Sequence, residues 1–329
     1  MGKDYIIHLN NQMNFISKIN AGICLKELMY LDYEYPPLFY AIAWLLKYIT
    51  GAYQAMFLIS SMFLTMLLLS VYGVGKTLGN RVVGIIAAYI CSFFPFIYKT
   101  SIQFNLELST AALSSLIIYL MLRVGEGNRL IYKILLILAI VAAGLTRQLI
   151  ILFVIGPLMC YSLNCFHNRE NVKKSHNIRD VWAALIISFV ILLIAYYHDL
   201  NTFDRLIGKV DERGLIDSGE VTLLYHAFYY IKAIPGQLSW AYTICFIMAL
   251  GFVFKLGEYS TNMFLAWFIP PLVVLTCVYN KFPEFTIGNL PVIALIIALA
   301  VDKVKSVKLK SIIAVGVVVV GVCQYFNNF

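Results

Sequence analysis

Long apolar runs recur along the whole sequence, and each is long enough, or nearly long enough, to cross a lipid bilayer. The clearest are residues 55–73, 82–98, 108–122, 181–197 and 312–326. A helix needs about 20 residues to cross the hydrocarbon layer, and it satisfies its own backbone hydrogen bonds there. Charged residues make up only 13% of the chain, whereas about a quarter is usual in a soluble domain. The sequence therefore predicts an all-α, polytopic membrane protein.

Hydropathy and loop charge together predict about ten spanning helices. They are expected near residues 54–76, 82–98, 107–123, 130–146, 148–165, 180–198, 236–254, 261–279, 287–302 and 310–327. Residues 36–50 are apolar but too short to span the bilayer. We expect them to form a helix that lies along the membrane surface.

Four regions follow from this assignment. Residues 1–53 form an outer N-terminal loop with a juxtamembrane helix, 54–198 a transmembrane module, 199–235 an outer loop and 236–329 the C-terminal transmembrane helices. The outer loop 199–235 is too long for a simple connection. Its part 223–234 mixes aromatic residues with a histidine and a lysine, which is typical of an amphipathic helix at the membrane surface. We expect this loop to act as a lid over a site on the outer face.

Basic residues are concentrated in alternate loops, and this predicts the orientation of the chain. The basic loops lie at 76–81, 123–129, 169–179, 255 and 303–310. Because cytoplasmic loops carry an excess of Lys and Arg, these loops are predicted to be cytoplasmic. The N-terminal region and the outer loop 199–235 then lie outside. The formal net charge of +8 reflects this distribution, and no single basic face indicates a nucleic-acid partner.

Cysteine usage indicates neither disulfides nor a metal site. Six of the seven cysteines fall in or at the ends of apolar runs, and none belongs to a CxxC pair. We interpret them as small buried apolar residues. No cofactor is predicted, and a requirement for a divalent cation is left open.

Short motifs follow one another in a distinctive order. An acid-rich N-terminal loop precedes Tyr-Pro-Pro-Leu-Phe-Tyr at 35–40, Gly-Lys-Thr-Leu-Gly at 75–79 and Ser-Phe-Phe-Pro-Phe at 92–96. Leu-Thr-Arg-Gln at 145–148 and Asn-Leu-Pro at 289–291 come later. With these motifs, the chain resembles the protein O-mannosyltransferase and aminoarabinose transferase group over most of its length. These are GT-C glycosyltransferases that use polyprenyl-phosphate sugars.

The resemblance implies an active site on the outer face of the membrane. The family carries a catalytic aspartate well before the Pro-Pro segment, and Asp4 stands in that place. A second acid near the outer end of a later helix helps to shape the family's site. Glu107 stands there, with Asn105 as the less favoured choice.

The chain also departs from the family pattern. It has Tyr5 after the first acid, where the family usually has Glu, and Tyr35 before Pro-Pro, where a polar residue is usual. Glu284-Phe285 replaces the usual Arg-Tyr before the late Leu-Pro helix. The family begins with a helix immediately before its catalytic aspartate, whereas this sequence starts only three residues before Asp4. We therefore expect that a first helix is missing, through an upstream start or a truncated gene; the alternative is that the short polar N-terminus crosses the membrane without a leading signal.

Sugar transfer to a hydroxyl needs a carboxylate that takes the proton and cations that stabilise the departing phosphate. Asp4 can serve as the base, with Asp32 and Glu34 as alternatives. The outer-face cations that could bind a lipid phosphate are Lys99, Arg147 and Lys281. The aromatic residues that could stack on a sugar or prenyl group are Tyr33, Tyr35, Tyr40, Phe104 and Tyr230.

Simpler interpretations of these residues stay open. Acids in an exposed loop often serve only to hydrate it, and Glu107 can stabilise the dipole of the helix that it begins. Arg147 can extend to lipid headgroups, and Lys99 and Lys281 can anchor helix ends. The aromatic residues fit the belt that marks membrane interfaces.

The prediction is an inverting membrane glycosyltransferase that moves a sugar from a polyprenyl-phosphate donor to an acceptor hydroxyl. The acceptor is a glycan, a lipid or a protein. The main alternative is a transporter or lipid flippase, although such proteins tend to place ionisable groups near the bilayer midplane. A glycan polymerase or an inactive relative is the other alternative.

Overall fold

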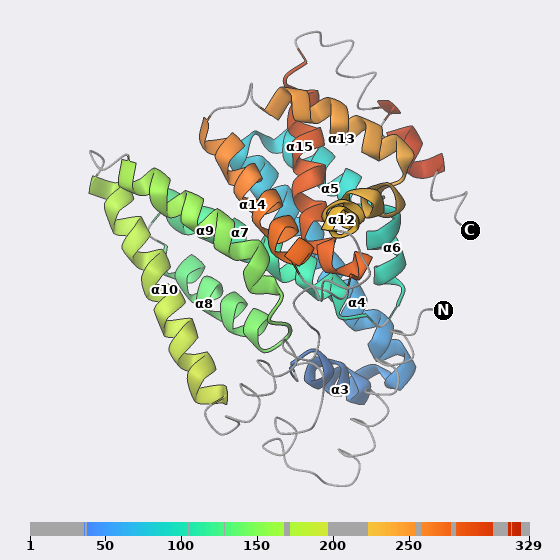
Figure 1. Ribbon diagram of the computed structural model, residues 1–329. Helices are drawn as coiled ribbons and strands as arrows, with labels where there is room; N and C mark the ends of the chain where they lie inside the picture. The colour runs from blue at the N-terminus through green and yellow to red at the C-terminus, as the bar shows by residue number, and fades with distance from the viewer. Residues whose placement is uncertain are drawn as a thin grey trace.

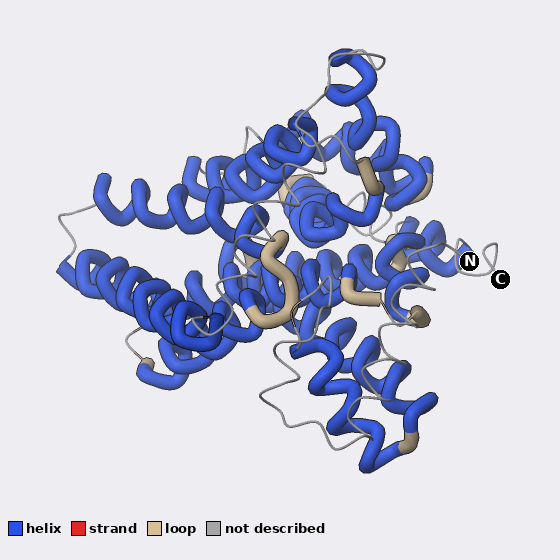
Figure 2. The backbone as a smooth tube through the Cα atoms, turned by 60° about the horizontal axis from the view of Figure 1, so that its bottom comes forward, coloured by secondary structure: helices blue, strands red, loops and turns tan. Residues whose placement is uncertain are grey.

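The computed structural model describes residues 36, 38–103, 105–127, 129–167, 172–196, 223–253, 258–277, 281–304, 315–316 and 318–323. Within these ranges every regular element is a helix (Figure 2). The α-helices are α3 (Leu38–Thr50), α4 (Ala52–Leu78), α5 (Arg81–Ser92), α6 (Pro95–Ser101), α7 (Glu107–Glu126), α8 (Leu130–Gly144), α9 (Ile150–His167), α10 (Val172–Tyr196), α12 (Leu223–Leu238), α13 (Trp240–Val253), α14 (Glu258–Cys277) and α15 (Leu290–Asp302). A 3₁₀ helix, η1 (Pro283–Asn289), leads directly into α15.

Among the described residues, five helices are long and apolar enough to cross a membrane, or up to seven if two bent pairs each count as one span. Helices α3, α8 and α9 are apolar but shorter. The chain is therefore a multi-pass membrane protein, as the sequence predicted, and its described part is all-helical. A helix is observed where one was expected at 36–50, as α3, and its position along the membrane surface stays a prediction. The last predicted span, 310–327, lies largely outside the described residues.

The predicted continuous helix at 82–98 is wrong, because the chain bends by 68° between α5 and α6. Helix α6 begins with Pro95. Proline lacks a backbone N–H and suits the first turn of a helix, whereas it disrupts a helix interior. At the other end of α5, the side chain of Asn80 accepts hydrogen bonds from the backbone N–H groups of Val82 and Val83, at 2.9 and 3.0 Å. Both ends of α5 are thus fixed by local sequence.

The predicted continuous span at 236–254 is also interrupted. Helices α12 and α13 meet at an angle of 120°. Between them, Ser239 has a φ of 75°, a left-handed conformation that is uncommon for residues other than glycine. The helix predicted at 223–234 is observed as the greater part of α12. Its role in a lid stays a prediction, and residues 199–222 lie outside the described part of the chain.

Helix α7 is the most enclosed of the long α-helices. Within its spanning window, 78% of the residues are buried, compared with 22% in α10. It packs against α4, α8, α9 and η1, and its N-terminal half is rich in Ser, Thr and Ala. Small side chains let neighbouring helix backbones approach closely in membranes. The apolar surface of α10, which includes Ile186, Phe189 and Ile194, is mostly exposed and so faces lipid.

Hydrogen bonds between helix ends mark two regions of the bundle, one beside α3 and the other at the opposite end, beside α13 (Figure 1). At one end, the backbone N–H of Leu38 donates to the carbonyl of Leu145 at 3.0 Å, which joins the start of α3 to the turn between α8 and α9. The start of α7 lies at this end too. At the opposite end, Asn80 Nδ2 donates to Asp302 Oδ2 at 3.1 Å and joins the start of α5 to the end of α15. The first of these two regions holds the candidate site.

Candidate active site

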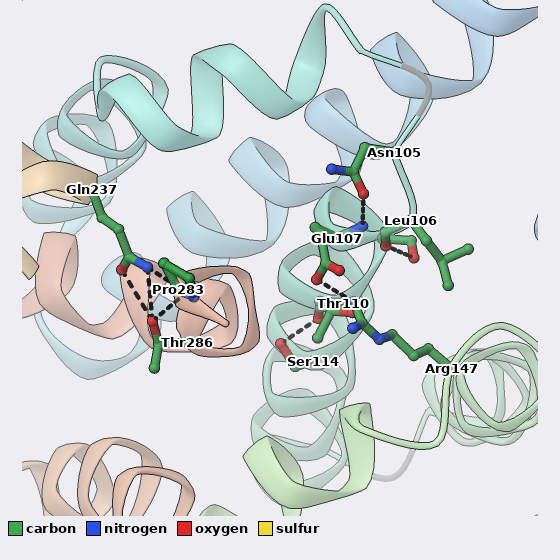
Figure 3. Close-up of polar contacts among 10 residues, drawn as sticks. Asn105, Leu106, Glu107, Thr110, Ser114, Arg147, Gln237, Pro283 and Thr286 are labelled. Carbon is green, nitrogen blue, oxygen red and sulfur yellow. Dashed lines mark hydrogen bonds and ion pairs between the residues drawn. The ribbon is translucent and has the colours of Figure 1, made fainter. Parts of the chain in front are cut away.

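A buried ion pair marks the centre of the candidate site. The Glu107 carboxylate, on the first residue of α7, accepts a hydrogen bond from Arg147 Nη1, in the turn between α8 and α9. The side chains of Arg147 and Glu107 are only 5% and 8% exposed. Figure 3 shows the two side chains pointing toward each other from separate elements. A buried charge is costly unless it is paired, so each residue makes the burial of the other tolerable.

Local backbone contacts fix both members of this pair. The Asn105 side chain accepts a hydrogen bond at 3.0 Å from the backbone N–H of Glu107, which satisfies one of the unpaired donors at the start of α7. The backbone N–H of Arg147 donates to the carbonyl of Ala143 at 2.9 Å, as a continuation of the last turn of α8. The negative charge of Glu107 also lies at the positive end of the α7 dipole.

An aromatic residue of η1 completes the surroundings of Arg147. The centroid of the Phe285 ring lies 5.7 Å from Arg147 Cζ, within the distance of a cation–π contact. The rings of Phe282 and Phe285 meet edge to face, with centroids 5.3 Å apart. Trp267 Nε1 donates to the carbonyl of Gly288 at 3.1 Å and holds η1 against α14. Three separate regions of the sequence therefore converge at Arg147.

The start of α3 reaches the same place. Because the N–H of Leu38 is bonded to the carbonyl of Leu145, the chain enters α3 beside a residue that is two positions from Arg147. Pro36, just before this helix, is buried. The five predicted site residues that precede it, Asp4, Asp32, Tyr33, Glu34 and Tyr35, lie outside the described residues.

Comparison with known protein families identifies the family to which the chain belongs. The family model for dolichyl-phosphate-mannose-protein mannosyltransferase matches residues 34–198, a range that holds both Glu107 and Arg147. The chain belongs to this mannosyltransferase family. The motif resemblance to GT-C glycosyltransferases is thereby confirmed. A comparison with curated protein sequences gave no match.

Two crystal structures of ArnT from Cupriavidus metallidurans share the fold. The structure in the apo state gives a TM-score of 0.64, and the structure bound to undecaprenyl phosphate gives 0.65. In both comparisons the identity is 13%, and the match covers 83% of this chain and 50% of ArnT. This chain therefore spans about half the length of ArnT.

The other two predicted cations of this mannosyltransferase-family chain lie apart from the ion pair. Lys281 Nζ donates to the carbonyl of Leu275 at 2.8 Å and also to that of Thr276, so it caps the end of α14. Burial lowers the pKa of Lys281. Lys99 is exposed on α6. Their binding of a donor phosphate stays a prediction.

The predicted cavity aromatics are largely packed against protein. Tyr40 is 1% exposed, and its ring meets Phe39 edge to face with centroids 5.7 Å apart. Tyr230 is 2% exposed, with Tyr229 edge-on to its ring and the Lys281 ammonium 5.5 Å from its centroid. Phe104 lies outside the described residues. Stacking by these residues is therefore still untested.

Sequence reasoning selected Glu107 and Arg147 separately and missed that they form a pair. They are 40 residues apart, and their contact depends on how α7 packs against the turn after α8. It also missed a contact between α12 and η1, in which Gln237 Nε2 donates to Thr286 Oγ1 at 2.9 Å. Figure 3 draws this contact as a group separate from the ion pair. No sequence signal links Gln237 with Thr286.

The described residues contain no group of three or more His, Cys, Asp and Glu side chains that could hold a metal ion. The N-terminal acids Asp4, Asp32 and Glu34 lie outside these residues. The one carboxylate at the centre of the described site, Glu107, is paired with a cation. The described part of the site is thus built around an ion pair.

Proposed function

We propose that this protein is a membrane glycosyltransferase that transfers a sugar from a polyprenyl-phosphate donor to an acceptor hydroxyl, with inversion. The observation that carries the proposal is the buried Glu107–Arg147 pair at one end of the bundle, in a chain of the mannosyltransferase family. Ionisable residues inside a membrane protein are costly and usually functional. The neighbouring ArnT structure holds undecaprenyl phosphate, which is a ligand of the proposed class.

We also propose that this site faces the outside of the membrane. The opposite end of the bundle carries Lys76, Arg81, Arg123 and Lys303 at the helix ends and turns. An excess of Lys and Arg is typical of cytoplasmic loops. The end with Glu107 would then open to the outer leaflet, where the acceptor is glycosylated.

The proposed reaction is a single displacement at the anomeric carbon of the donor sugar. The acceptor oxygen forms the new glycosidic bond, the bond to the phosphate oxygen breaks, and a carboxylate takes the acceptor proton. Asp4 is the proposed base, with Asp32 and Glu34 as alternatives. The polyprenyl phosphate leaves with its negative charge, which Arg147 stabilises. A guanidinium recognises carboxylates and phosphates by the same planar geometry, and Glu107 holds it in position.

The test is a transfer assay with the purified full chain and undecaprenyl-phosphate sugars. We expect Asp4→Asn to lower the rate by about 100- to 10,000-fold, as is usual for loss of a general base. Glu126→Gln, an exposed acid at the opposite end of α7, is the matched control and keeps its activity. Near-normal turnover by Asp4→Asn would show that Asp4 is not the base, and Asp32 or Glu34 would then be assigned this role.

The whole proposal is tested in cells that lack the protein. We expect a glycan residue to be missing while the lipid-linked donor accumulates. If the cells instead fail to take up a solute and keep their glycans intact, the protein is a transporter and the proposal is wrong.

A further inference from the structure

Helix α12 is joined to the segment around η1 by several polar contacts. Tyr229 Oη donates to the carbonyl of Lys281 at 3.1 Å, and the ammonium of Lys281 lies over the ring of Tyr230. Near the end of α12, Gln237 Nε2 donates to Thr286 Oγ1 at 2.9 Å. These contacts position α12 against η1, which itself reaches Arg147 through Phe285.

Two buried polar atoms in this group have hydrogen-bonding capacity that no described residue uses. Tyr230 Oη finds no hydrogen-bond acceptor, and Glu284 Oε2 finds no donor, among the described residues. Both atoms are buried, and the two side chains are close enough to interact electrostatically. Lys281 forms no hydrogen bond with either atom, and its ammonium donates to two carbonyls at the end of α14. Leaving a buried polar group unsatisfied costs free energy, so a ligand that satisfied both atoms would bind more tightly.

The chemistry of the two atoms restricts what this ligand can be. A phenol hydroxyl needs an acceptor, while a carboxylate oxygen needs a donor. A phosphate cannot donate when ionised and is repelled by the carboxylate, and a prenyl chain offers neither group. An ammonium group donates but has no lone pair with which to accept. An alcohol hydroxyl both accepts and donates, so a molecule with several hydroxyls can satisfy both Tyr230 and Glu284.

The position of this pair indicates which molecule carries the hydroxyls. Glu284 precedes Phe285, whose ring lies against Arg147, the residue proposed to hold the donor phosphate. The donor sugar is bonded directly to that phosphate, so its hydroxyls must lie near Arg147. Glu284 is only partly buried and Phe282 is 43% exposed, so this segment lies near the surface of the protein.

We propose that Glu284 and Tyr230 form a subsite for the hydroxyls of the donor sugar, connected to the Glu107–Arg147 pair through Phe285. The proposal rests on the proposed glycosyltransferase function. Arg147 would bind the phosphate, which all polyprenyl-phosphate donors share. Glu284 and Tyr230 would bind the sugar, which differs between donors. The two residues would therefore determine which sugar is used.

The test compares binding of undecaprenyl phosphate with binding of its mannosyl, glucosyl, galactosyl and N-acetylglucosaminyl forms by the purified full chain. We expect at least one of the sugar forms to bind more tightly than undecaprenyl phosphate. Glu284→Gln should reduce that extra affinity by about tenfold and Tyr230→Phe by about threefold, because hydrogen bonds to charged groups are the stronger ones. Both variants should bind undecaprenyl phosphate as the unchanged protein does, which also shows that they are folded.

Matched controls separate a local effect from a general one. Tyr48→Phe on α3 is exposed, and Glu126→Gln is exposed at the opposite end of α7; both should keep the full extra affinity. If no sugar form binds more tightly than undecaprenyl phosphate, the subsite does not exist, although the transferase proposal survives. If undecaprenyl phosphate itself does not bind, both proposals fail. If both variants keep the extra affinity, or lose only affinity for the acceptor, the assignment to the donor sugar is wrong.

Discussion

Breaking the Glu107–Arg147 pair should destabilise the protein far more than breaking an exposed pair. The two side chains are 8% and 5% exposed, so removing one partner leaves the other charged and buried. Such a change costs about 3–5 kcal/mol in buried pairs. Glu107 variants also lose up to about 1 kcal/mol of favourable interaction with the α7 dipole. We therefore expect Glu107→Gln and Arg147→Met each to cost at least about 3 kcal/mol.

The double variant Glu107→Gln with Arg147→Met should recover more than half of the summed loss, because neither charge is then left unpaired. A buried ion pair replaced by neutral groups of similar volume is often close to neutral in stability. The exposed Arg123–Glu126 pair, with side chains 30% and 44% exposed, provides the matched cycle. For Arg123→Met with Glu126→Gln we expect a coupling energy below about 1 kcal/mol.

The assay is the unfolding of all six variants and the unchanged protein in one detergent, analysed as two double-mutant cycles. Transfer activity is measured on the same samples, and Glu107→Gln should abolish it. The reasoning is refuted if the coupling energy of Glu107 with Arg147 is no larger than that of Arg123 with Glu126. It is also refuted if Glu107→Gln retains full stability, since the guanidinium would then be tolerated without its partner.

Three further predictions follow from other features. A cysteine probe introduced at Asp204 should react from outside the cell and one at Lys173 should not, because basic loops lie inside; the reverse pattern would contradict the proposed orientation. Gly288→Ala should cost about 1–3 kcal/mol by overpacking, because a Cβ there would lie 2.6 Å from the Phe153 ring, and unfolding of the variant measures it. Burial lowers the folded-state pKa of Lys281 below its ordinary value of 10.5, so the unfolded chain binds more protons and stability should rise as pH rises toward 10.5. The Lys281→Met variant should lack that rise in an unfolding series across pH.

Helices and some of their ends were predictable because they depend on nearby residues. Hydropathy located the spanning segments, and Pro95 is a local reason for the bend between α5 and α6. The bend at Ser239 has no such signal, since serine has no preference for its φ of 75°. Long-range packing must impose that conformation.

The candidate site was predictable only as a set of separate residues. A carboxylate at the start of an apolar helix stands out, and so does an arginine between two apolar runs, so Glu107 and Arg147 could both be selected. Their pairing, and the addition of Phe285, depend on three segments that meet only after folding. The hydrogen bond from Leu38 to Leu145 is made by backbone atoms, which carry no sequence signal.

The enclosure of α7 has a consequence for how the protein is made. Its mean hydropathy over the spanning window is 1.6, compared with 2.3 for α10, so it has less tendency to enter the bilayer unaided. Glu107 leaves the ribosome 40 residues before Arg147, a delay of about 2–8 s at ordinary rates of synthesis. During that interval α4, already synthesised, is the neighbour available to shelter α7. Slowing translation just before Arg147 should therefore prolong the exposure of an unpaired carboxylate and send more of the nascent chain to degradation.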